Sequence, residues 1–503
     1  MGADVIVVGG GTAGCVLAAR LSEEEACSVV LVESGPDYPT LDELPADVAD
    51  ASEPTVGHDW GYQAEADSLD RRISLPRARL IGGCSATNGC FALRGAPADY
   101  DRWHELGNPG WSFAEVLPFF RRLESDLDFA DQWHGADGPI PIRRHPVDEL
   151  NPIQRAFIDA AVQAGHAYVA DHNRPGALGV GPTPRNVRDG LRMSTAVAYL
   201  SAARHRPNLT IRSGVTIGWV RIADGVAVGV RSTTGELIEA DRVVLAAGSY
   251  ASPAILARSG IGSAARLSRL GIDVVADLPA VGEHLIDHPI VAVDLPTRPA
   301  DGPRFQAIAT LAPTSAGPPD LHLFTAGPFP VERDVSEAGA VFGIVAGLIA
   351  PRSRGSVRLR SADPDDPPLI DVAHLRHPDD LARMVEAIVE ARRIARTEPL
   401  AALVTGAELA PGPTVADDDH TAIADSVRAR VASYHHPVGT CRMGPDPDHD
   451  AVVDAQGRVY GVDRLWVADA SVMPAIPAAG TNLPTIMLAE RISTWLRTPS
   501  GTP

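Results

Sequence analysis

The first 35 residues carry the clearest pattern of apolar and polar positions in the chain. Residues 5–8 are an apolar run, residues 9–14 are rich in glycine, residues 13–21 suit a buried helix, and residues 28–32 form a second apolar run. Short apolar runs without polar alternation are typical of strands that are buried on both faces of a parallel sheet. The pattern therefore predicts a β-α-β unit at the start of the chain.

Further strands are predicted at residues 209–212, 226–232 and 242–245. The last of these ends in the small-residue turn Ala246-Ala-Gly-Ser, which is a plausible second strand end for nucleotide contact. The carboxyl ends of such strands are the usual place for nucleotide binding in α/β sheets.

The pattern changes between about residues 291 and 430. Short strands alternate there with proline-bearing loops, and one helix is predicted over 379–397 from the near-helical spacing of its apolar residues. We interpret this region as a separate module. The chain then returns to a glycine- and histidine-bearing stretch and to a final helix that is expected to run through Arg491.

Composition and charge narrow the classes of partner. Of the 503 residues, 64 are acidic and 44 basic, which gives a formal net charge of −20. Because nucleic acids and anionic lipids are bound largely through clustered lysine and arginine, we expect no nucleic-acid partner. The sequence has no run of eighteen apolar residues, no signal-peptide pattern and no metal-binding spacing of histidine or cysteine. We therefore expect a cytoplasmic protein without a membrane span or a metal.

Glycine and proline are unusually frequent, with 46 and 43 residues respectively. Such an excess indicates either low-complexity linkers or many special turns. The glycines gather partly at residues 9–14, 82–89 and 248, and many prolines interrupt the loops of the second module. No low-complexity tract is found, so the excess belongs to turns.

The glycine-rich turn at the start of the chain has the form Gly9-x-Gly11-x-x-Gly14. In this motif the glycines allow a tight turn, a close approach to a pyrophosphate and close packing of the helix on the sheet. Glu33 follows nineteen residues after Gly14, where a carboxylate can bind an adenosine ribose. The alternative is an ordinary βα turn with a solvated Glu33.

The first motif does not distinguish NAD from FAD. A second glycine-rich segment, GGCSATNGC at residues 82–90, suits a long, extended and buried cofactor, although the segment alone is equally typical of an ordinary loop. It therefore favours FAD without establishing it.

His435 and His436 are candidates for acid–base chemistry, since the ordinary pKa of histidine, about 6.5, lies near the working pH. Adjacent side chains do not easily point into one pocket, and a lone histidine is more often a core or surface residue than a catalyst. The residues alone leave the role of both open. No G-x-S-x-G elbow supports acyl transfer.

Several segments in order resemble the glucose-methanol-choline (GMC) family of FAD-dependent oxidoreductases. They are VIVVGGGTAGCVLA (5–18), RLIGGCSATNG (79–89), RG (94–95) with DYDRW (99–103), GSYASPAIL (248–256), HPVGT (436–440) and LWVADASVMP (465–474). Within the family the chain is most similar to bacterial alcohol dehydrogenases and hydroxymethylfurfural-type oxidases. The stretch HGADGPIPIR (134–143) also resembles mycofactocin-associated members.

The resemblance implies an α/β fold, in which a doubly wound, Rossmann-like FAD-binding domain carries a second, β-rich α+β substrate-binding domain. Residues 1–290 are expected to form the N-terminal part of the FAD-binding domain, with substrate-side insertions near 130–190. Residues 291–430 are expected to form the substrate-binding domain. Residues 431–503 are expected to return to the first domain and to carry the catalytic histidine.

The resemblance also implies where FAD binds. Asn88 and Gly89 would lie near the isoalloxazine, Val215 on the adenine side, and Asp469 with Ala470 near the pyrophosphate and ribityl chain. The implied cofactor-binding residues are Gly9, Gly11, Thr12, Ala13, Gly14, Glu33, Ser34, Trp60, Arg79, Gly82, Ser85, Asn88, Gly89, Val215, Gly248, Asp469, Ala470, Asn482 and Thr485.

The implied reaction is oxidation of a primary alcohol to an aldehyde. His436 aligns with the family's catalytic histidine and would accept the hydroxyl proton while hydride passes to flavin N5. Partners would be a small-molecule alcohol and an electron acceptor, either O₂ or another redox carrier. The acidic balance adds a mild expectation of neutral or cationic alcohols over acids.

Two positions depart from the family pattern. Thr87 stands where some members tether FAD through histidine, so FAD is expected to be non-covalent. Gly480 stands where the family places a second active-site histidine or asparagine. Either Asn482 or His435 substitutes for it, or the pocket is wider and the substrate or activity altered. Two further hypotheses are a hydroxynitrile-type lyase and a catalytically weakened FAD-binding protein.

Overall fold

The first of two large sheets lies at the N-terminal side of the molecule. The computed structural model describes residues 2–65, 71–313 and 317–497. Within them this sheet has seven strands in the order β10-β2-β1-β13-β12-β11, with β23 also paired to β13. Its strands are β1 (Ala3–Val8), β2 (Val29–Val32), β10 (Leu209–Arg212), β11 (Ile217–Ala223), β12 (Val226–Ser232), β13 (Leu237–Leu245) and β23 (Leu465–Val467). The strands predicted at 209–212 and 226–232 are confirmed, and that at 242–245 is the end of β13.

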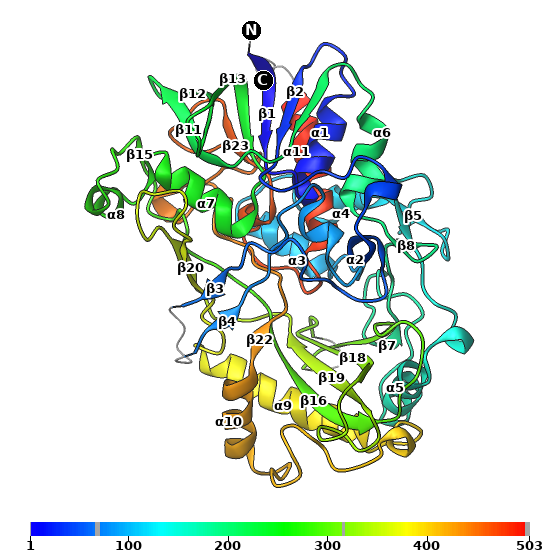
Figure 1. The fold of residues 1–503 in the computed structure, drawn as a ribbon. Coiled ribbons are helices and arrows are strands. Elements are labelled where there is room, and N and C mark those ends of the chain that lie inside the picture. The colour runs from blue at the N-terminus through cyan, green and yellow to red at the C-terminus, as the bar shows by residue number, and fades with distance from the viewer. Residues whose placement is uncertain (1, 66–70, 314–316, 498–503) are drawn as a thin grey trace.

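The predicted β-α-β unit is confirmed as β1, α1 (Thr12–Leu21) and β2, and β1 and β2 pair in parallel. Val5, Ile6 and Val7 have no exposed surface, because β1 is a central strand between β2 and β13. Helix α1 packs against α11 (Asn482–Arg497), and α7 (Gly248–Arg258) packs against β11 (Figure 1). The last helix therefore continues six residues beyond the expected Arg491.

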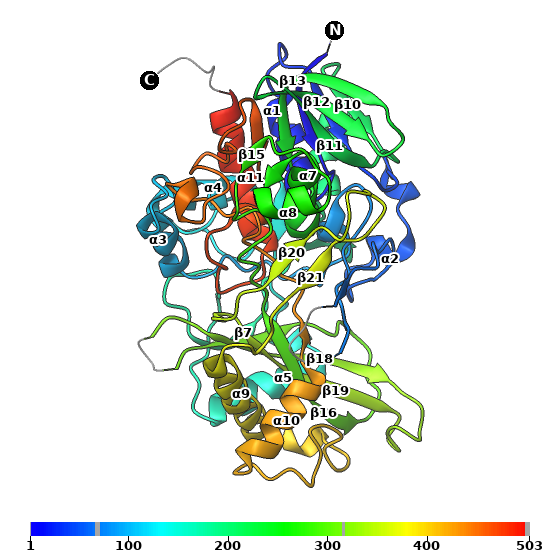
Figure 2. The same cartoon turned by 90° about the vertical axis from the view of Figure 1, so that its left-hand side faces the viewer.

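The second large sheet is antiparallel and lies at the opposite end of the molecule (Figure 2). Its order is β22-β16-β19-β18-β17-β7. The strands are β7 (Gly179–Pro182), β16 (Pro289–Thr297), β17 (Ala307–Leu311), β18 (Leu321–Pro330), β19 (Ala340–Leu348) and β22 (Ala432–Ser433). Helices α5 (Pro152–Gln163), α9 (Pro378–Ala395) and α10 (His420–Arg430) cover one face. Helix α9 confirms the helix predicted at 379–397.

Side chains on this second sheet alternate between two faces, as the period of two in a strand requires. On β18, Leu321 and Leu323 pack with the helices, whereas Phe324 and Ala326 belong to a separate apolar cluster on the other face. On β19, Ile344 likewise faces the helices and Val345 the other side. The sheet therefore presents a second apolar surface, which no helix of the described residues covers.

Smaller elements complete the described part of the chain. A four-stranded sheet of order β20-β21-β3-β4 lies between the large sheets, and two-residue or three-residue strands form the remaining pairs. The helices are α2 (Ala46–Ala49), α3 (Pro97–Glu105), α4 (Phe113–Leu123), α6 (Ser201–Ala203) and α8 (Ala264–Arg269). The strands are β3 (Gln63–Ala64), β4 (Ile73–Ser74), β5 (Glu124–Asp126), β6 (Ile140–Ile142), β8 (Val187–Arg188), β9 (Leu191–Arg192), β14 (Ile261–Gly262), β15 (Ala276–Asp277), β20 (Ser356–Arg358) and β21 (Leu369–Asp371). Across the described ranges, every helix is too short or too polar to span a bilayer.

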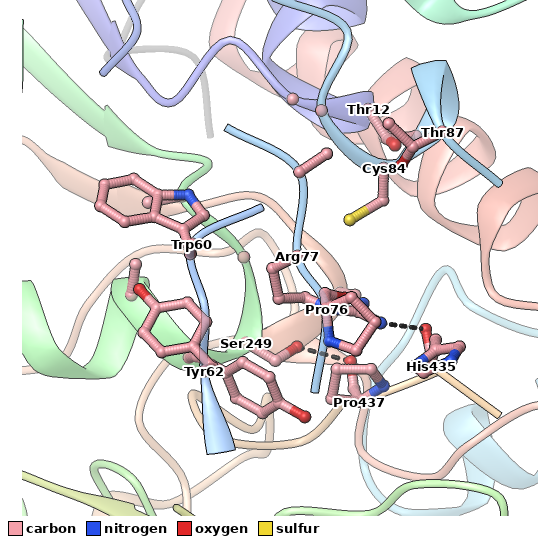
Figure 3. Close-up of a pocket in the computed structure, with 18 of the residues that line it drawn as sticks. Thr12, Trp60, Tyr62, Pro76, Arg77, Cys84, Thr87, Ser249, His435 and Pro437 are labelled. Atoms are coloured by element: carbon pink, nitrogen blue, oxygen red, sulfur yellow. Dashed lines mark hydrogen bonds between the residues drawn. The ribbon is translucent and has the colours of Figure 1, made fainter. Parts of the chain in front are cut away.

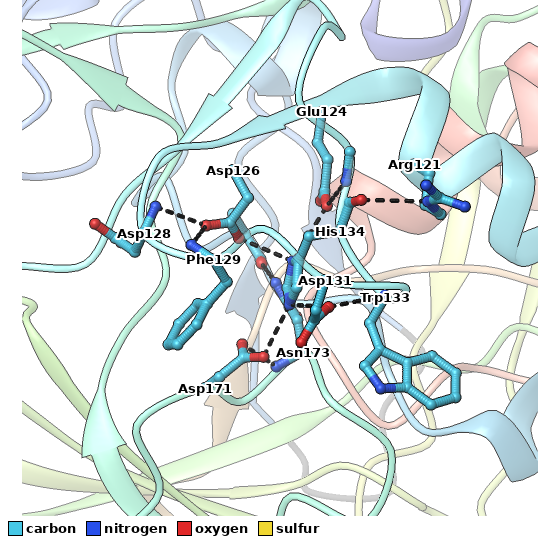
Figure 4. A network of polar contacts seen from close by, with 12 residues as sticks. Arg121, Glu124, Asp126, Asp128, Phe129, Asp131, Trp133, His134, Asp171 and Asn173 are labelled. Carbon is cyan, nitrogen blue, oxygen red and sulfur yellow. Dashed lines mark hydrogen bonds and ion pairs between the residues drawn. The ribbon is translucent and has the colours of Figure 1, made fainter.

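A buried network of charged side chains joins β5 to the loops that follow it (Figure 4). His134 Nδ1 lies 3.0 Å from Asp126 Oδ2, and His134 Nε2 lies 2.9 Å from Asp171 Oδ2. Arg144 bridges Asp126 and Asp171 at 2.8 Å from each. Glu124, also close to His134, pairs with Arg94. The network therefore anchors the segment around residue 94 to the segments that contain His134, Arg144 and Asp171.

The geometry of this network makes His134 a cation. Both ring nitrogens face carboxylates, so both donate, and an imidazolium has no lone pair left for a metal. Although burial lowers the pKa of His134, hydrogen bonds to Asp126, Asp171 and Glu124 raise it to about 10. Among the described residues Glu124, Asp126 and His134 are the only group with metal-ligand geometry, and their charges are balanced by Arg94 and Arg144.

Replacing His134 by phenylalanine is expected to lower the free energy of unfolding by about 3 kcal/mol at pH 7, because buried carboxylates lose their cationic partner. The pKa of His134 is raised, so its stabilisation is complete below its ordinary value and is lost as the pH rises through about 10. The difference from wild type should therefore shrink between pH 7 and 10 in urea titrations.

His104→Phe is the matched control, since His104 is exposed on α3. It should change the unfolding free energy by less than about 0.5 kcal/mol. A His134→Phe difference that stays constant across this pH range would contradict the cationic role of His134.

Candidate active site

One large cavity lies between the two sheets. Its volume is about 760 Å³. Val8, Val32 and Ala246 line it from the carboxyl ends of β1 and β2 and just after β13, and Ile290 and Phe324 line it from the second sheet. The carboxyl edge of the parallel strands is where α/β sheets bind nucleotides.

Of the three glycines in the Gly9-x-Gly11-x-x-Gly14 turn, only Gly11 has room where a Cβ would lie. A Cβ on Gly9, where φ is +100°, would lie 2.6 Å from the Ala246 carbonyl oxygen, and a Cβ on Gly14 would lie 1.8 Å from the Gly9 oxygen. A Cβ on Gly11 would meet only Gly83 Cα, at 3.9 Å. Gly9 and Gly14 therefore shape the turn, whereas Gly11 leaves space at the N-terminus of α1.

Glu33 directly follows β2, and backbone amides fix its carboxylate. Its Oε2 accepts a hydrogen bond from Gly10 N and its Oε1 one from Gly35 N, both at 2.8 Å. Burial raises the pKa of Glu33, although these hydrogen bonds oppose the rise. Each oxygen retains a further lone pair for a ribose hydroxyl.

Most of the cofactor-binding residues expected from the sequence line this one cavity, together with His435, His436 and Gly480. Figure 3 shows Thr12, Cys84 and Thr87 grouped in one part of the cavity, with His435 and Pro437 in another. The expected residues that line it are Gly9, Gly11, Thr12, Ala13, Glu33, Ser34, Trp60, Asn88, Gly89, Val215, Gly248, Asp469, Ala470, Asn482 and Thr485.

Four expected cofactor residues lie behind the lining and support it. Gly14 packs under the first turn, and the Gly82 amide donates to the Gly10 carbonyl at 2.7 Å. Ser85 Oγ donates to the Gly82 carbonyl at 2.6 Å. The Arg79 guanidinium lies 4.8 Å from the ring centroid of Trp60, which does line the cavity.

Asp469 ties three segments together. Its Oδ2 accepts hydrogen bonds from Gly248 N at 2.8 Å and Ser252 Oγ at 2.6 Å, and its Oδ1 accepts one from Ser471 N. These bonds hold the N-terminus of α7 against the end of β23. Asp469 therefore positions the Gly248 turn at the cavity.

His436 is fixed by its backbone and by a second histidine. Its amide donates to Asp287 Oδ1 at 2.8 Å, and its Nδ1 lies 3.0 Å from Nδ1 of His288. Two facing nitrogens at this distance share one proton, so one imidazole donates and the other accepts. If His436 is the donor, its Nε2 carries a free lone pair.

Burial lowers the pKa of His436 well below its ordinary value, and the neighbouring His288 adds to this effect. Burial also lowers the pKa of His288, to about 4. Both rings are therefore neutral near pH 7, and His436 is able to accept a proton there.

His435 lines the same cavity from an unusual backbone conformation. Its φ is +67°, and its carbonyl oxygen accepts a hydrogen bond from Arg77 Nη2 at 2.9 Å. This turn explains how adjacent histidines reach one cavity, which the sequence argument disfavoured. His435 has no hydrogen bond like that between His436 and His288, and burial lowers its pKa to about 4.

Space takes the place of a side chain at Gly480. A Cβ on Gly480 would lie 3.5 Å from His436 Nε2, so this position faces the candidate base directly. Asn482 begins α11 two residues later, and its buried Nδ2 has no hydrogen-bond partner among the residues that the structure describes. Such an unpaired buried donor is costly unless a ligand or water accepts from it.

Other lining residues were not predicted from the sequence. Arg77, Phe91, Phe324 and Tyr434 line the cavity, and His288 lies behind His436. They come from separate segments without a shared motif, so only the folded chain brings them together.

The cavity fits the FAD that the sequence resemblance implies. The N-terminus of α1 with the gap at Gly11 suits a pyrophosphate. Glu33 suits the adenosine ribose, and the unpaired Asn482 Nδ2 suits an acceptor on the cofactor.

Comparison with known proteins gives the family. Models described as GMC oxidoreductase match residues 3–290 and 351–489. An uncharacterised GMC-type oxidoreductase of Rhodococcus erythropolis is 36% identical over 501 residues, covering 98% of both chains. An oxygen-dependent choline dehydrogenase of Brucella anthropi is 36% identical over 542 residues, covering 99% of this chain and 96% of the relative.

A solved structure of pyridoxine 4-oxidase from Mesorbium loti superposes with a TM-score of 0.90 at 33% identity, covering 98% of this chain and 99% of that one. The two family models together match most of the chain, and the relatives span nearly all of it. The chain therefore belongs to the GMC oxidoreductase family of FAD-dependent enzymes.

Proposed function

We propose that this protein oxidises a primary alcohol to an aldehyde, with His436 as the base. The observation that carries the proposal is the neutral His436 beside open space at Gly480, with its Nδ1 paired to His288. The relatives named choline dehydrogenase and pyridoxine 4-oxidase support an alcohol group as the reacting centre. Residues 1–290 and 431–503 would form the FAD-binding domain, with insertions near 130–190 on the substrate side, and residues 291–430 the substrate-binding domain.

In this mechanism bound FAD supplies the hydride acceptor. The alcohol hydroxyl donates its proton to His436 Nε2, while His436 Nδ1–H donates to His288. Asp287 holds the His436 backbone through its amide, and its negative charge favours the imidazolium that forms. The cost of burying that imidazolium keeps His436 neutral before the reaction.

Because Gly480 has no side chain, the substrate hydroxyl lacks the polar contact that a histidine or asparagine at this position would make. Asn482 is the side chain that we assign to supply a donor near this end of the cavity, because its Nδ2 is unpaired and buried. Since His436 and the glycine-rich cofactor segments are all present, we favour retained alcohol oxidation.

Replacing His436 by alanine is expected to leave FAD bound but to slow flavin reduction by about 10²–10⁴-fold, the usual contribution of a general base. The measurement is stopped-flow bleaching of the oxidised flavin under anaerobic primary alcohol.

His435→Asn is the matched control, because asparagine tolerates the left-handed backbone at this position. It should slow flavin reduction far less than His436→Ala. Equal losses in the two variants, or an unchanged rate in His436→Ala, would remove His436 from its assigned role.

The rate of flavin reduction should depend on pH in a defined direction. The pKa of His436 is lowered by burial, so the base is neutral at and above its ordinary pKa. The rate should be flat from pH 8 to about 6.5 and fall only at lower pH, as His436 becomes protonated. A fall that begins above pH 7 would contradict the neutral base.

FAD should be held without a covalent bond, since Thr87 offers no imidazole for a tether. Acid denaturation followed by filtration should release all flavin absorbance into the filtrate.

Gly11→Ala should weaken FAD binding with little change in the stability of the apoprotein, because its Cβ projects into open space.

Gly14→Ala is the contrasting variant. Its Cβ would collide with the Gly9 oxygen, so it should lower the unfolding free energy of the apoprotein by about 1–3 kcal/mol. The stability of each apoprotein is measured by thermal unfolding, and its affinity for FAD by titration. A Gly11→Ala protein that binds FAD normally would show that the pyrophosphate lies elsewhere.

A further inference from the structure

A continuous row of aromatic rings leads away from His436. The ring centroid of Tyr434 lies 4.4 Å from that of His436, and Phe324 stacks on Tyr434 at 5.4 Å with an interplanar angle of 18°. Phe91 meets Phe324 edge to face at 5.5 Å, and Phe305 meets Phe91 at 6.2 Å. Phe91, Phe305, Phe324 and Tyr434 all line the cavity, and we call them the aromatic wall.

The uncovered face of the second sheet extends this wall with aliphatic side chains. Ile290, Ala326 and Val345 line the cavity beside Phe324. Phe324 pairs with Val345 across β18 and β19. His322 lies on the same face, and burial lowers its pKa well below the ordinary value, so it is uncharged. The face of the second sheet that lines the cavity is therefore apolar and neutral.

The acidic side chains that line the cavity lie away from the second sheet. Glu33 and Asp469 accept backbone hydrogen bonds at the turns of the first sheet, and Asp59 accepts one from Arg77 N. Asp365 and Asp366 lie beside the first sheet. The Cβ of the preceding residue, Pro364, is 3.5 Å from the place that a Cβ on Gly218 of β11 would occupy. Among the described residues, no carboxylate that lines the cavity belongs to the second sheet.

The basic side chains of the lining are held by backbone carbonyls. Arg258 Nε donates to the Gly218 carbonyl of the first sheet. Arg77 Nη2 donates to the His435 carbonyl and its Nε to the Pro76 carbonyl, and its guanidinium lies 5.9 Å from the Tyr250 ring centroid. A charged substrate group placed against the aromatic wall would thus lose its hydration without gaining a partner of opposite charge.

We propose that the substrate is a neutral aromatic primary alcohol, whose ring lies against the aromatic wall while its carbinol group reaches His436. This rests on the proposed alcohol oxidation. Flat rings gain from stacked and edge-to-face contacts beyond the area that they bury. The carbinol O–H proton goes to His436 and the carbinol hydride to FAD, which gives an aryl aldehyde and reduced flavin. A ring conjugated to the carbinol carbon stabilises the positive charge that develops there as hydride leaves.

The wall also argues against a cationic substrate. Aromatic faces attract ammonium groups, but Phe91, Phe305 and Phe324 contact one another at centroid distances between 5.5 and 6.5 Å, so these rings are already packed against each other. A quaternary ammonium would also lack a carboxylate on the second sheet. We therefore expect choline to be a poor ligand for this protein.

Binding can be measured apart from catalysis in the FAD-loaded His436→Ala protein. Benzyl alcohol, cyclohexylmethanol, choline and 4-(hydroxymethyl)benzoate would each be titrated, with perturbation of the flavin absorbance as the signal. Benzyl alcohol should bind at least about tenfold more tightly than choline or the benzoate, and more tightly than cyclohexylmethanol.

Variants of the wall then locate the site. Phe324→Leu and Phe91→Leu, each in the His436→Ala background, should raise the dissociation constant for benzyl alcohol by about tenfold and that for cyclohexylmethanol by less than about threefold. Phe119→Leu is the control, because Phe119 lies on α4 outside the cavity lining. It should leave both constants unchanged.

Choline binding as tightly as benzyl alcohol, or equal effects of the wall variants on both neutral alcohols, would overturn the proposed substrate class. Flavin in the wild-type protein should be bleached by benzyl alcohol. If benzyl alcohol binds as expected but bleaches nothing, alcohol oxidation is wrong and the neutral aromatic ligand class still stands. If aliphatic or cationic alcohols bleach the flavin fastest, oxidation stands and the aromatic substrate class fails.

Discussion

The candidate site depends on the place where two distant segments of the chain cross between the sheets. Ile286 and Val438 exchange both backbone hydrogen bonds, and Pro289 at the start of β16 pairs with Ser433 of β22. Buried Asp287 completes this crossing by accepting from the amide of His436 and from the Ser433 hydroxyl. Burial opposes its ionisation, yet the nearby His374 and Ser433 hold the pKa of Asp287 well below its usual range.

Because the crossing joins the two sheets, it fixes the position of the residues on one sheet relative to those on the other. One segment delivers His288 and leads into the second sheet, and the other delivers His436 and leads back toward β23 and Asp469. The imidazole pair therefore sits where the glycine-rich turns of one sheet face the aromatic wall of the other. A shift of either segment by one residue would separate His436 from His288, since side chains alternate in extended backbone.

The sequence allowed most of the first sheet and its turns to be predicted, although not β11 or β23, because the information there is local. The apolar run at β1, the spacing of Gly9, Gly11 and Gly14, and the acid at Glu33 all lie within 35 residues. The helix α9 was also predictable, since its buried residues repeat with helical spacing. The family resemblance extended this reading to His436 and Asp469.

The aromatic wall and the imidazole pair could not be predicted in the same way. Phe91, Phe324 and Tyr434 are separated by more than one hundred residues from one another, and only the folded chain brings their rings into contact. His288 follows an aspartate just before the second module, and no motif of the sequence includes it. Its importance comes from a single 3.0 Å contact that no local pattern encodes.

The low proton affinity of His436 constrains the order of events in the proposed reaction. A buried imidazole whose pKa is lowered gains little by taking a proton from an intact alcohol, which is a far weaker acid. The hydroxyl becomes strongly acidic only as hydride leaves the carbinol carbon and positive charge builds there. Proton transfer to His436 is thus favoured together with hydride departure or after its onset. An aromatic ring on the carbinol carbon stabilises this positive charge. The neutral base and the apolar wall therefore suit the same substrate, an aromatic primary alcohol.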